Sequence, residues 1–232
     1  MAKLTWDQTG EKKYENGVKY GVLYKKETKN DVEKWYGYAW NGLTSVTESP
    51  EGAEKTDLYA DNIKYASFRS AETFGGTIEA YTYPPEFADC NGEKKVGGVM
   101  TVGQQKRSAF GLCYRTEQGN DEDPNFGYKL HLVYNCTCSP SERAYETIND
   151  SPDAMTLSWE FDSTPVDTGE TGYNQTSLVV IDSADFTDDT AKAHLAALEA
   201  ALYGTDGQNG TEPYLPTPSQ VKQLLTTGSI SG

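Results

Sequence analysis

Long hydrophobic runs are missing from this sequence, and none approaches the ~20 apolar residues that a membrane-spanning helix needs. The first residues, MAKLTWDQTGEKKYENG, contain no hydrophobic signal region either. This start predicts a protein that is made and folded in a cytoplasm rather than an exported precursor. The composition therefore argues against the membrane-protein and secreted-precursor classes.

Positive charge is scarce in the second half of the chain. Residues 1–115 contain 16 Lys/Arg and 16 Asp/Glu, whereas residues 116–232 contain 4 Lys/Arg and 19 Asp/Glu. The whole formal charge of −15 therefore lies in the second half. High affinity for phosphate needs clustered Lys and Arg, so this half should repel nucleic acid rather than bind it. An acidic surface that merely keeps a protein soluble remains an equal alternative.

The motifs of common enzyme classes are missing as well. The sequence has no G-x-S-x-G, P-loop, G-x-G-x-x-G or H-E-x-x-H pattern. The two histidines, His131 and His194, fall on a predicted strand and a predicted helix without a neighbouring nucleophile motif. NDEDPN (120–125) lacks the glycine and the terminal glutamate of a calcium loop, and it predicts a hairpin turn. We expect no catalytic, cofactor-binding or metal-binding residue, and hence no enzyme.

Cysteine is rare, and the four that exist are not spaced for zinc. Zinc sites show C-x₂₋₄-C pairs with a second pair or histidines at matching spacing. Here Cys136 and Cys138 form a C-x-C, and Cys90 and Cys113 stand alone. On a strand Cys136 and Cys138 would share one face, a poor geometry for a mutual disulfide. The cysteines are predicted to be reduced core residues.

Much of the sequence shows the alternation of apolar and polar residues that predicts β-strands. Alternating apolar residues, bounded by turn signals, predict strands over 18–26, 108–116, 127–137, 154–163 and 176–182. A further strand region is predicted over 36–48, interrupted by an Asn-Gly pair that signals a turn or bulge. Charged loops are expected at 27–35 and 49–56, and a connector at 82–98 contains one predicted helical turn, PEFADC.

Two helices follow the strands. The first should begin at an N-cap Thr187, place Ala191, Leu195, Leu198 and Leu202 on one face, and stop at Gly204. The second, TPSQVKQLL, has Thr217 as N-cap, Pro218 at the first helical position and Gln220 completing a capping box. The class is therefore α+β and mainly β. The expected organisation is a β-rich domain over 1–204 and a linker with a short helix over 205–232.

Residues 57–84, DLYADNIKYASFRSAETFGGTIEAYTYP, read as one long β-hairpin. Each arm of about twelve residues would extend roughly 40 Å at ~3.3 Å per residue. Alternation predicts an apolar face with Tyr59, Ile63, Tyr65, Phe74, Ile78 and Ala80, and a small, polar face with Asn62, Lys64, Ala66, Thr73, Thr77, Glu79 and Tyr81. Such a pattern suits a barrel wall that borders water, with its edges closed by neighbouring subunits.

Several segments in fixed order carry a resemblance to a known family. They are NGVKYGVLY, WNGLTSVTESPEGAE, DLYADNIKYASFRSAETFGGTIEAYTYPPEFADC, GQQKRSAFGLCYRTE, GYKLHLVYN, PSERAYETINDSP and ALEAALYGTDG. From about residue 14 to 218 the chain resembles the major tail proteins of long, non-contractile-tailed phages and related prophages of Gram-positive bacteria. LYADN and GGTIEAYTYP are the most specific parts. CTC at 136–138 and the linker around 165–175 depart from the family pattern.

The resemblance implies a β-sandwich or barrel core with a flanking helix, and a virion protein made in the host cytoplasm. Its partners would be copies of itself, in stacked hexameric rings, together with a tape-measure protein and tail terminator and initiator proteins. Long hairpins would line the channel through which genomic DNA passes without specific binding. The resemblance carries over no catalytic motif and no cofactor.

On this basis two sets of residues become candidates. Expected lumen-facing residues are Asn62, Lys64, Glu72, Thr77 and Glu79, with the carboxylates of Glu72 and Glu79 outweighing the positive charge of Lys64 and Arg69. Expected contact residues between subunits or rings lie in the two charged loops: Lys29, Asp31, Glu33, Glu51, Glu54 and Lys55.

A different class of function stays open. A secreted β-sandwich carbohydrate-binding module would suit the richness in tyrosine and tryptophan and the acidic surface. Trp35, Tyr36, Tyr38 and Trp40 would then form the platform on which a sugar stacks.

Overall fold

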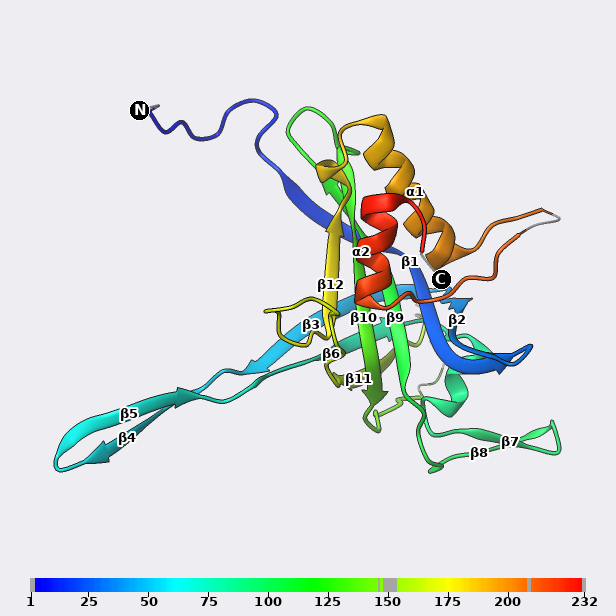
Figure 1. Ribbon diagram of the computed structural model, residues 1–232. Coiled ribbons are helices and arrows are strands. Elements are labelled where there is room, and N and C mark those ends of the chain that lie inside the picture. Colours follow the sequence, from blue (N-terminus) through cyan, green and yellow to red (C-terminus); the bar gives the residue numbers. More distant parts are fainter. Residues whose placement is uncertain (1–2, 146, 148–153, 208–209, 231–232) are drawn as a thin grey trace.

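The computed structural model describes residues 3–145, 147, 154–207 and 210–230. The protein is mainly β, with one eight-stranded antiparallel sheet, two helices against the sheet and two hairpins that project from the body (Figure 1). The sheet has the order β2-β1-β9-β10-β11-β6-β3, and β12 pairs with β10 beside this path. The expected α+β, mainly β class is confirmed.

The strands are β1 (Tyr14–Lys29), β2 (Val32–Ala39), β3 (Leu43–Gly52), β4 (Lys55–Ala60), β5 (Ile63–Arg69), β6 (Glu72–Ala80), β7 (Lys94–Val96), β8 (Met100–Val102), β9 (Phe110–Gly119), β10 (Gly127–Cys138), β11 (Leu157–Ser163) and β12 (Leu178–Asp182). The two α-helices are α1 (Asp189–Tyr203) and α2 (Pro218–Thr227), and two short 3-10 helices are η1 (Pro85–Asp89) and η2 (Ser183–Asp185). The strands predicted from alternation exist, and the 36–48 region is divided by a turn at Asn41 and Gly42 into the end of β2 and the start of β3. The helical turn expected in the connector is η1.

A first core lies where the two ends of the sheet face each other. Leu23, Leu112 and Val133, on β1, β9 and β10, share one buried cluster with Ile78 and Trp159, on β6 and β11. Aromatic rings fill its centre. Phe87 of η1 has its ring centroid 5.4 Å from those of Phe110 and Trp159, in edge-to-face contacts that add to the burial itself. The sheet therefore forms two layers around this core.

A second core lies on the other side of β1, β9 and β10, beneath the helices. Its buried members from the sheet are Val22, Tyr24, Cys113, Leu130, Leu132, Tyr134 and Ile181, and those from the helices and the segment between them are Leu195, Leu198, Ala201, Leu202, Leu215, Val221 and Leu224. The buried Tyr24 hydroxyl donates to the backbone oxygen of Leu202 at 2.8 Å. Residues of the 205–232 segment thus contribute to the same core as α1.

Helix ends follow the expected chemistry, with one correction. The N-cap of α1 is Asp188, whose side chain accepts from the backbone N–H of Ala191, so the prediction of Thr187 was wrong by one residue. Either residue can cap a helix, so the sequence alone did not choose between them. In α2, Thr217 and Gln220 form the predicted capping box.

The long hairpin is real, but its predicted boundaries were wrong. The chain turns at Asp61 and Asn62, both at positive φ (52° and 62°), as a two-residue turn of mirror-image type requires. The two arms therefore run over 43–60 and 63–80 rather than within 57–84. At about eighteen residues and ~3.3 Å each, an arm extends roughly 60 Å. The segment 49–56, expected as a loop, belongs mostly to β3 and β4.

The other expected loop, 27–35, is also mostly strand. β1 and β2 pair from Val22↔Ala39 to Lys29↔Val32, and only Asn30 and Asp31 lie between them. Both have positive φ (51° and 62°), which asparagine and aspartate tolerate better than most residues. The many charged residues of 27–35 had indicated a loop. The strand pairing nevertheless continues to the two-residue turn.

Candidate functional site on the outer face of the long hairpin

The root of the long hairpin forms a three-stranded wall of the body. β6 pairs with β3 on one side and with β11 on the other, so Ile78 lies between Val46 and Trp159. These three side chains face the first core. Because side chains alternate along a strand, every second residue of this wall points away from the core.

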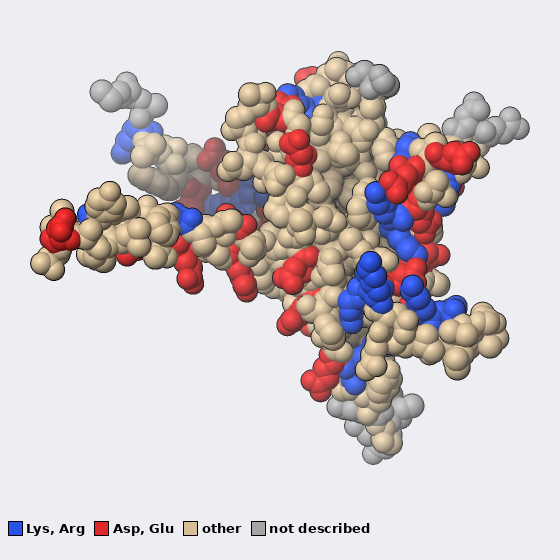
Figure 2. Space-filling view, turned by 60° about the horizontal axis from the view of Figure 1, so that its bottom comes forward, with Lys and Arg blue, Asp and Glu red and all other residues tan. Residues whose placement is uncertain are grey.

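The outward-facing positions of the wall are hydroxyl, glycine or carboxylate residues. They are Ser45, Thr47, Ser49 and Glu51 on β3, Thr73, Gly75, Thr77 and Glu79 on β6, and Ser158, Glu160 and Asp162 on β11. In these three fully described strands, no lysine, arginine or large apolar residue occupies an outward position of the paired region. We call this surface the acidic wall. Figure 2 shows acidic side chains along the projecting hairpin and the adjoining body, whereas most basic side chains in that view lie on the other side.

Glycine keeps the acidic wall flat and closely paired. A Cβ atom at Gly76 would lie 2.2 Å from the backbone oxygen of Thr47, and one at Gly75 would lie 2.7 Å from that of Phe161. Neither distance is tolerable for a real Cβ atom, so only glycine fits at these positions. The register of β6 is continuous here, and a bulge that would swap the faces of the second arm does not occur.

Glu79 is held in place on the acidic wall. Its carboxylate accepts a hydrogen bond from the Ser45 hydroxyl at 2.7 Å, across the β3–β6 pair. A bond from a hydroxyl to an ionised group fixes the side chain's direction without neutralising its charge. The half-buried Glu79 side chain therefore lies on the central strand of the wall, at the end nearest the body.

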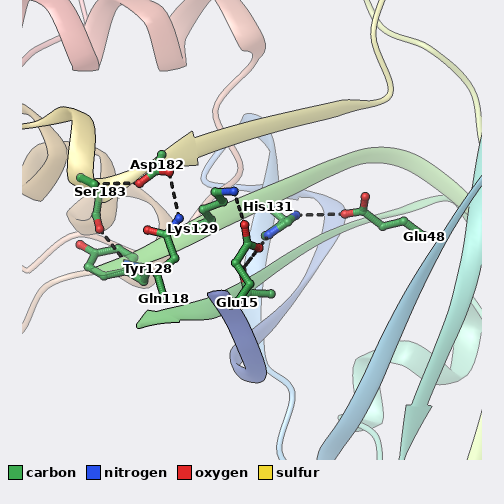
Figure 3. A network of polar contacts seen from close by, with 10 residues as sticks. Glu15, Glu48, Gln118, Tyr128, Lys129, His131, Asp182 and Ser183 are labelled. Atoms are coloured by element: carbon green, nitrogen blue, oxygen red, sulfur yellow. Dashed lines mark hydrogen bonds and ion pairs between the residues drawn. The ribbon is translucent and has the colours of Figure 1, made fainter. Parts of the chain in front are cut away.

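On the core side, the root of the hairpin is joined to the body by a polar cluster (Figure 3). His131 on β10 places Nδ1 3.0 Å from a Glu48 carboxylate oxygen and Nε2 3.1 Å from the Thr116 hydroxyl. Tyr114 on β9 donates its hydroxyl to the same Glu48 and stacks on the His131 ring, with centroids 4.6 Å apart. Glu48 is the only member of this cluster that belongs to the hairpin.

The hydrogen bond from His131, followed by that from Tyr114, lowers the pKa of Glu48 below its ordinary value of 4.5. Burial, together with the bond to Glu48, raises the pKa of Tyr114. Thr116, His131 and Glu48 are arranged as a hydroxyl, an imidazole and a carboxylate, the order of a nucleophile relay. Thr116 lies opposite Lys129 in the β9–β10 register. His131 and Tyr114 both bond to Glu48, so the arrangement joins β3 of the hairpin to β9 and β10.

A second row of contacts in Figure 3 continues along β10 toward α1. Lys129 forms an ion pair with Glu15 of β1, and Gln118 donates to Asp182 of β12 at 2.9 Å. The Ser183 hydroxyl accepts from the backbone N–H of Tyr128 at 2.8 Å. These contacts join β1, β9, β10 and β12, and they contribute to a rigid body from which the hairpin projects.

The distal part of the hairpin, β4 and β5, has no other strand beside it among the described residues. Asp57 forms ion pairs with Lys64 (2.9 Å) and Lys55 (3.5 Å) and accepts from Ser67. Large apolar side chains are nevertheless exposed: Leu58, Tyr59 (70%), Ile63 (65%), Tyr65 (75%) and Phe68. A two-stranded hairpin alone is marginally stable in water. Exposed apolar area on such an element is typical of an interaction surface.

The structure separates the residues predicted to share a polar face. Thr77 and Glu79 lie on the acidic wall, as alternation predicted for β6. Glu72 falls on the opposite side of β6, in step with Phe74 and Ile78, so grouping it with Glu79 was wrong. Asn62 is in the turn, and Lys64 pairs with Asp57 on the distal hairpin.

The apolar face predicted for the first arm was wrong as well, since Tyr59, Ile63 and Tyr65 are exposed rather than part of the core. The sequence analysis did not place three carboxylates on the acidic wall, namely those of Glu51, Glu160 and Asp162. The alternation of LSWEFDS (157–163) contained the signal for the last two, because Trp159 and Phe161 are the buried partners of Glu160 and Asp162.

The predicted contact residues lie in two separate places. Lys29, Asp31 and Glu33 are at the β1–β2 turn, where Lys29 lies over the Tyr36 ring at 4.2 Å and Glu33 pairs with Lys26 at 2.8 Å. Glu51, Glu54 and Lys55 lie where β3 passes into β4, between the body and the distal part of the long hairpin (Figure 1).

The aromatic platform proposed for sugar binding does not exist as one exposed surface. Trp40 is 3% exposed and Tyr36 is 7% exposed. The Trp40 ring packs against Phe87, with centroids 4.6 Å apart, and its indole N–H donates to the backbone oxygen of Thr82. Trp40 belongs to the first core because its side chain faces inward from the connection between β2 and β3.

No protein-family model matches this chain, and no curated protein sequence matches it. Among the described residues, no helix is both long enough and apolar enough to cross a membrane. The same residues contain no group of three or more His, Cys, Asp or Glu side chains arranged to hold a metal ion.

Proposed function

We propose that this protein is the subunit of a hollow tube, the tail tube of a long, non-contractile-tailed phage or prophage, built from stacked hexameric rings. The sequence resemblance provides the hypothesis. The observation that carries it in the structure is the acidic wall, an extended sheet surface of hydroxyls and carboxylates that continues into the long projecting hairpin.

A wall of this composition suits a channel for DNA. Duplex DNA carries about one negative charge per 1.7 Å, and each lysine or arginine contact would add salt-dependent affinity. Electrostatic screening acts within ~8 Å at physiological salt, so repulsion requires carboxylates on the channel surface itself. Glu51, Glu79, Glu160 and Asp162 would supply it, while the serine and threonine hydroxyls keep water bound to the wall.

The long hairpin supports assembly from several copies. Its outer edge at β3 carries unpaired backbone groups, and its distal half exposes apolar side chains. Contacts between different surfaces of identical subunits generate rings when the rotation closes. Hairpins from neighbouring subunits would then pair side by side and complete the barrel that surrounds the channel.

Electron microscopy of the concentrated full-length protein tests the proposal. Rings or tubes with a central channel are expected, together with a concentration-dependent increase of mass in solution. A dimer that persists at high concentration, with the long hairpin protected inside it, would contradict the proposal.

A further inference from the structure

The second projecting hairpin, β7–β8, pairs with no other strand among the described residues. It forms a two-stranded sheet of its own, with Gly97 and Gly98 at the tip. Val99 is 93% exposed, and Val96 and Met100 are about half exposed. Such an isolated hairpin with an apolar tip is marginal in water, so its order is expected to depend on a neighbour.

The stem and base of β7–β8 are basic. Lys94, Lys95 and Lys106 are exposed, and Arg107 is half-buried. These four cations contrast with an overall formal charge of −15. Figure 1 places this hairpin at the lower end of the body, whereas β12 leads upward to the start of α1 at the opposite end.

At that opposite end the protein has a hollow of about 550 Å³. It lies between the β9–β10 turn and the beginning of α1, and Phe126, Phe186 and Leu195 supply its apolar lining. Lys19, Arg115 and Lys192 also line it, although Glu117 pairs with Arg115 at 3.0 Å and with Lys19 at 3.7 Å. The β9–β10 turn and the segment from η2 to the start of α1, which border the hollow, carry exposed carboxylates: Asp121, Glu122, Asp123, Asp185, Asp188 and Asp189.

We propose that the β7–β8 hairpin of one copy docks into this hollow of a second copy. Val99 and Met100 would occupy the apolar lining, and Lys94 and Lys95 would face the surrounding carboxylates. The two surfaces are different, lie at opposite ends of the body and have opposite charge, so the contact is head-to-tail. Repeated, it would stack subunits along one axis rather than close a dimer.

This inference rests on the proposed function only in that a second copy supplies the hollow. It names the contact between successive layers, whereas the long hairpin would act within a layer. The two ideas can therefore fail separately.

Cross-linking between two single-cysteine variants tests the contact. Val99→Cys is mixed with Asn125→Cys, an exposed residue that lines the hollow, and a short bismaleimide linker is added. The matched control mixes Val99→Cys with Tyr173→Cys, which is 75% exposed in the 164–177 segment. Because all four native cysteines are buried, the background is expected to be low.

The expected result is a covalent dimer in the first mixture at a yield at least about tenfold above the control, falling as salt is added. A double reversal, Lys94→Glu with Lys95→Glu, should weaken it by about tenfold, since like charges would then meet. Glu122→Lys with Asp185→Lys on the other chain should restore it. Lys26→Glu with Lys34→Glu, the same charge change elsewhere, should leave the yield unchanged.

A yield equal to the control overturns the docking contact. If tubes form while the cross-link stays at that level, the proposed function stands and this contact is wrong. If the cross-link forms with the predicted charge dependence but microscopy shows only short chains without a channel, the contact stands and the tube is wrong.

Discussion

The Glu48 carboxylate lies 3.0 Å from Nδ1 of His131, and this pair joins the root of the long hairpin to β10. The pKa of Glu48 is lower in the folded protein than its ordinary value of 4.5. A lowered carboxyl pKa stabilises the fold above the unfolded value and loses that contribution as the pH falls through the folded value. The hairpin attachment is therefore expected to weaken in acid.

We predict that Glu48→Gln lowers the free energy of unfolding by about 1.5 kcal/mol at pH 7, the lower end of the range for a hydrogen bond to a charged group. The difference from the native protein should shrink as the pH falls below the ordinary carboxyl pKa of 4.5, because the contribution of a lowered pKa is lost on that side. Urea titrations at pH 7 and pH 3 measure it, with the exposed Glu51→Gln as control. An equal loss at both pH values would show that the ionised form of Glu48 contributes nothing.

The long hairpin can be removed without disturbing the body. Gly52 and Glu72 are register partners, so residues 53–71 can be replaced by a two-residue Asn-Gly turn that joins β3 to β6 directly. All large residues in 53–71 are outside both buried clusters, and the shortened protein should keep the melting temperature of the original to within a few degrees. It should no longer polymerise.

Light scattering against concentration measures the effect, and circular dichroism verifies the fold. Polymers of normal size from the shortened protein would remove the hairpin from the assembly account. A shorter deletion, residues 50–55, should give the same phenotype because it removes the pairs that connect the body to the distal hairpin.

Alternation and capping chemistry could be read from the sequence over most of the fold, because each is decided within a few neighbouring residues. The strands, the capping box at Thr217 and the inward cysteines belong to this group. The position of the turn in the long hairpin was harder to predict. Both Asp61–Asn62 and the polar stretch 69–72 have residues that suit a turn. The turn lies at Asp61–Asn62 because β3 pairs with β6, a contact between segments that are separated in the sequence.

The acidic wall was only partly predictable for the same reason. Thr77 and Glu79 follow from the pattern of one strand. Glu160 and Asp162 come from β11, about eighty residues later, and only sheet order places them beside β6. Glu72 was assigned to the polar face because it is charged, although its position in the alternation places it with Phe74 and Ile78. As the first residue of β6 it is exposed even though it points to the same side as these apolar residues.

The four thiols provide a test of the cores. Burial raises the pKa of Cys90, Cys113 and Cys138 to about 12, so the reactive thiolate is very scarce at pH 8. In native protein at pH 8, a thiol reagent should label none of the four within minutes, and in urea it should label all four. Fast labelling of Cys90 or Cys138 in native conditions would mean that the first core opens locally.

Glu79 offers the sharpest single charge change on the acidic wall. Glu79→Lys should leave folding and assembly largely intact, since the side chain is only partly buried and makes one hydrogen bond, with Ser45, on the outward side of the wall. It should slow DNA ejection from particles that carry it, and the slowing should be several-fold greater at about 50 mM than at about 200 mM salt. Asp206→Lys, the same charge change at an exposed residue shortly after α1, is the control. Ejection at the native rate at both salt concentrations would exclude Glu79 from the channel.

The central claim is that the acidic wall borders the channel of a tube. A three-dimensional reconstruction of assembled tubes, fitted with this fold, measures that position directly. We predict that Glu79 and Glu160 face the central channel and that α1 and α2 lie on the tube's exterior. Tubes with the helices toward the channel and Glu79 on the outer surface would contradict the account.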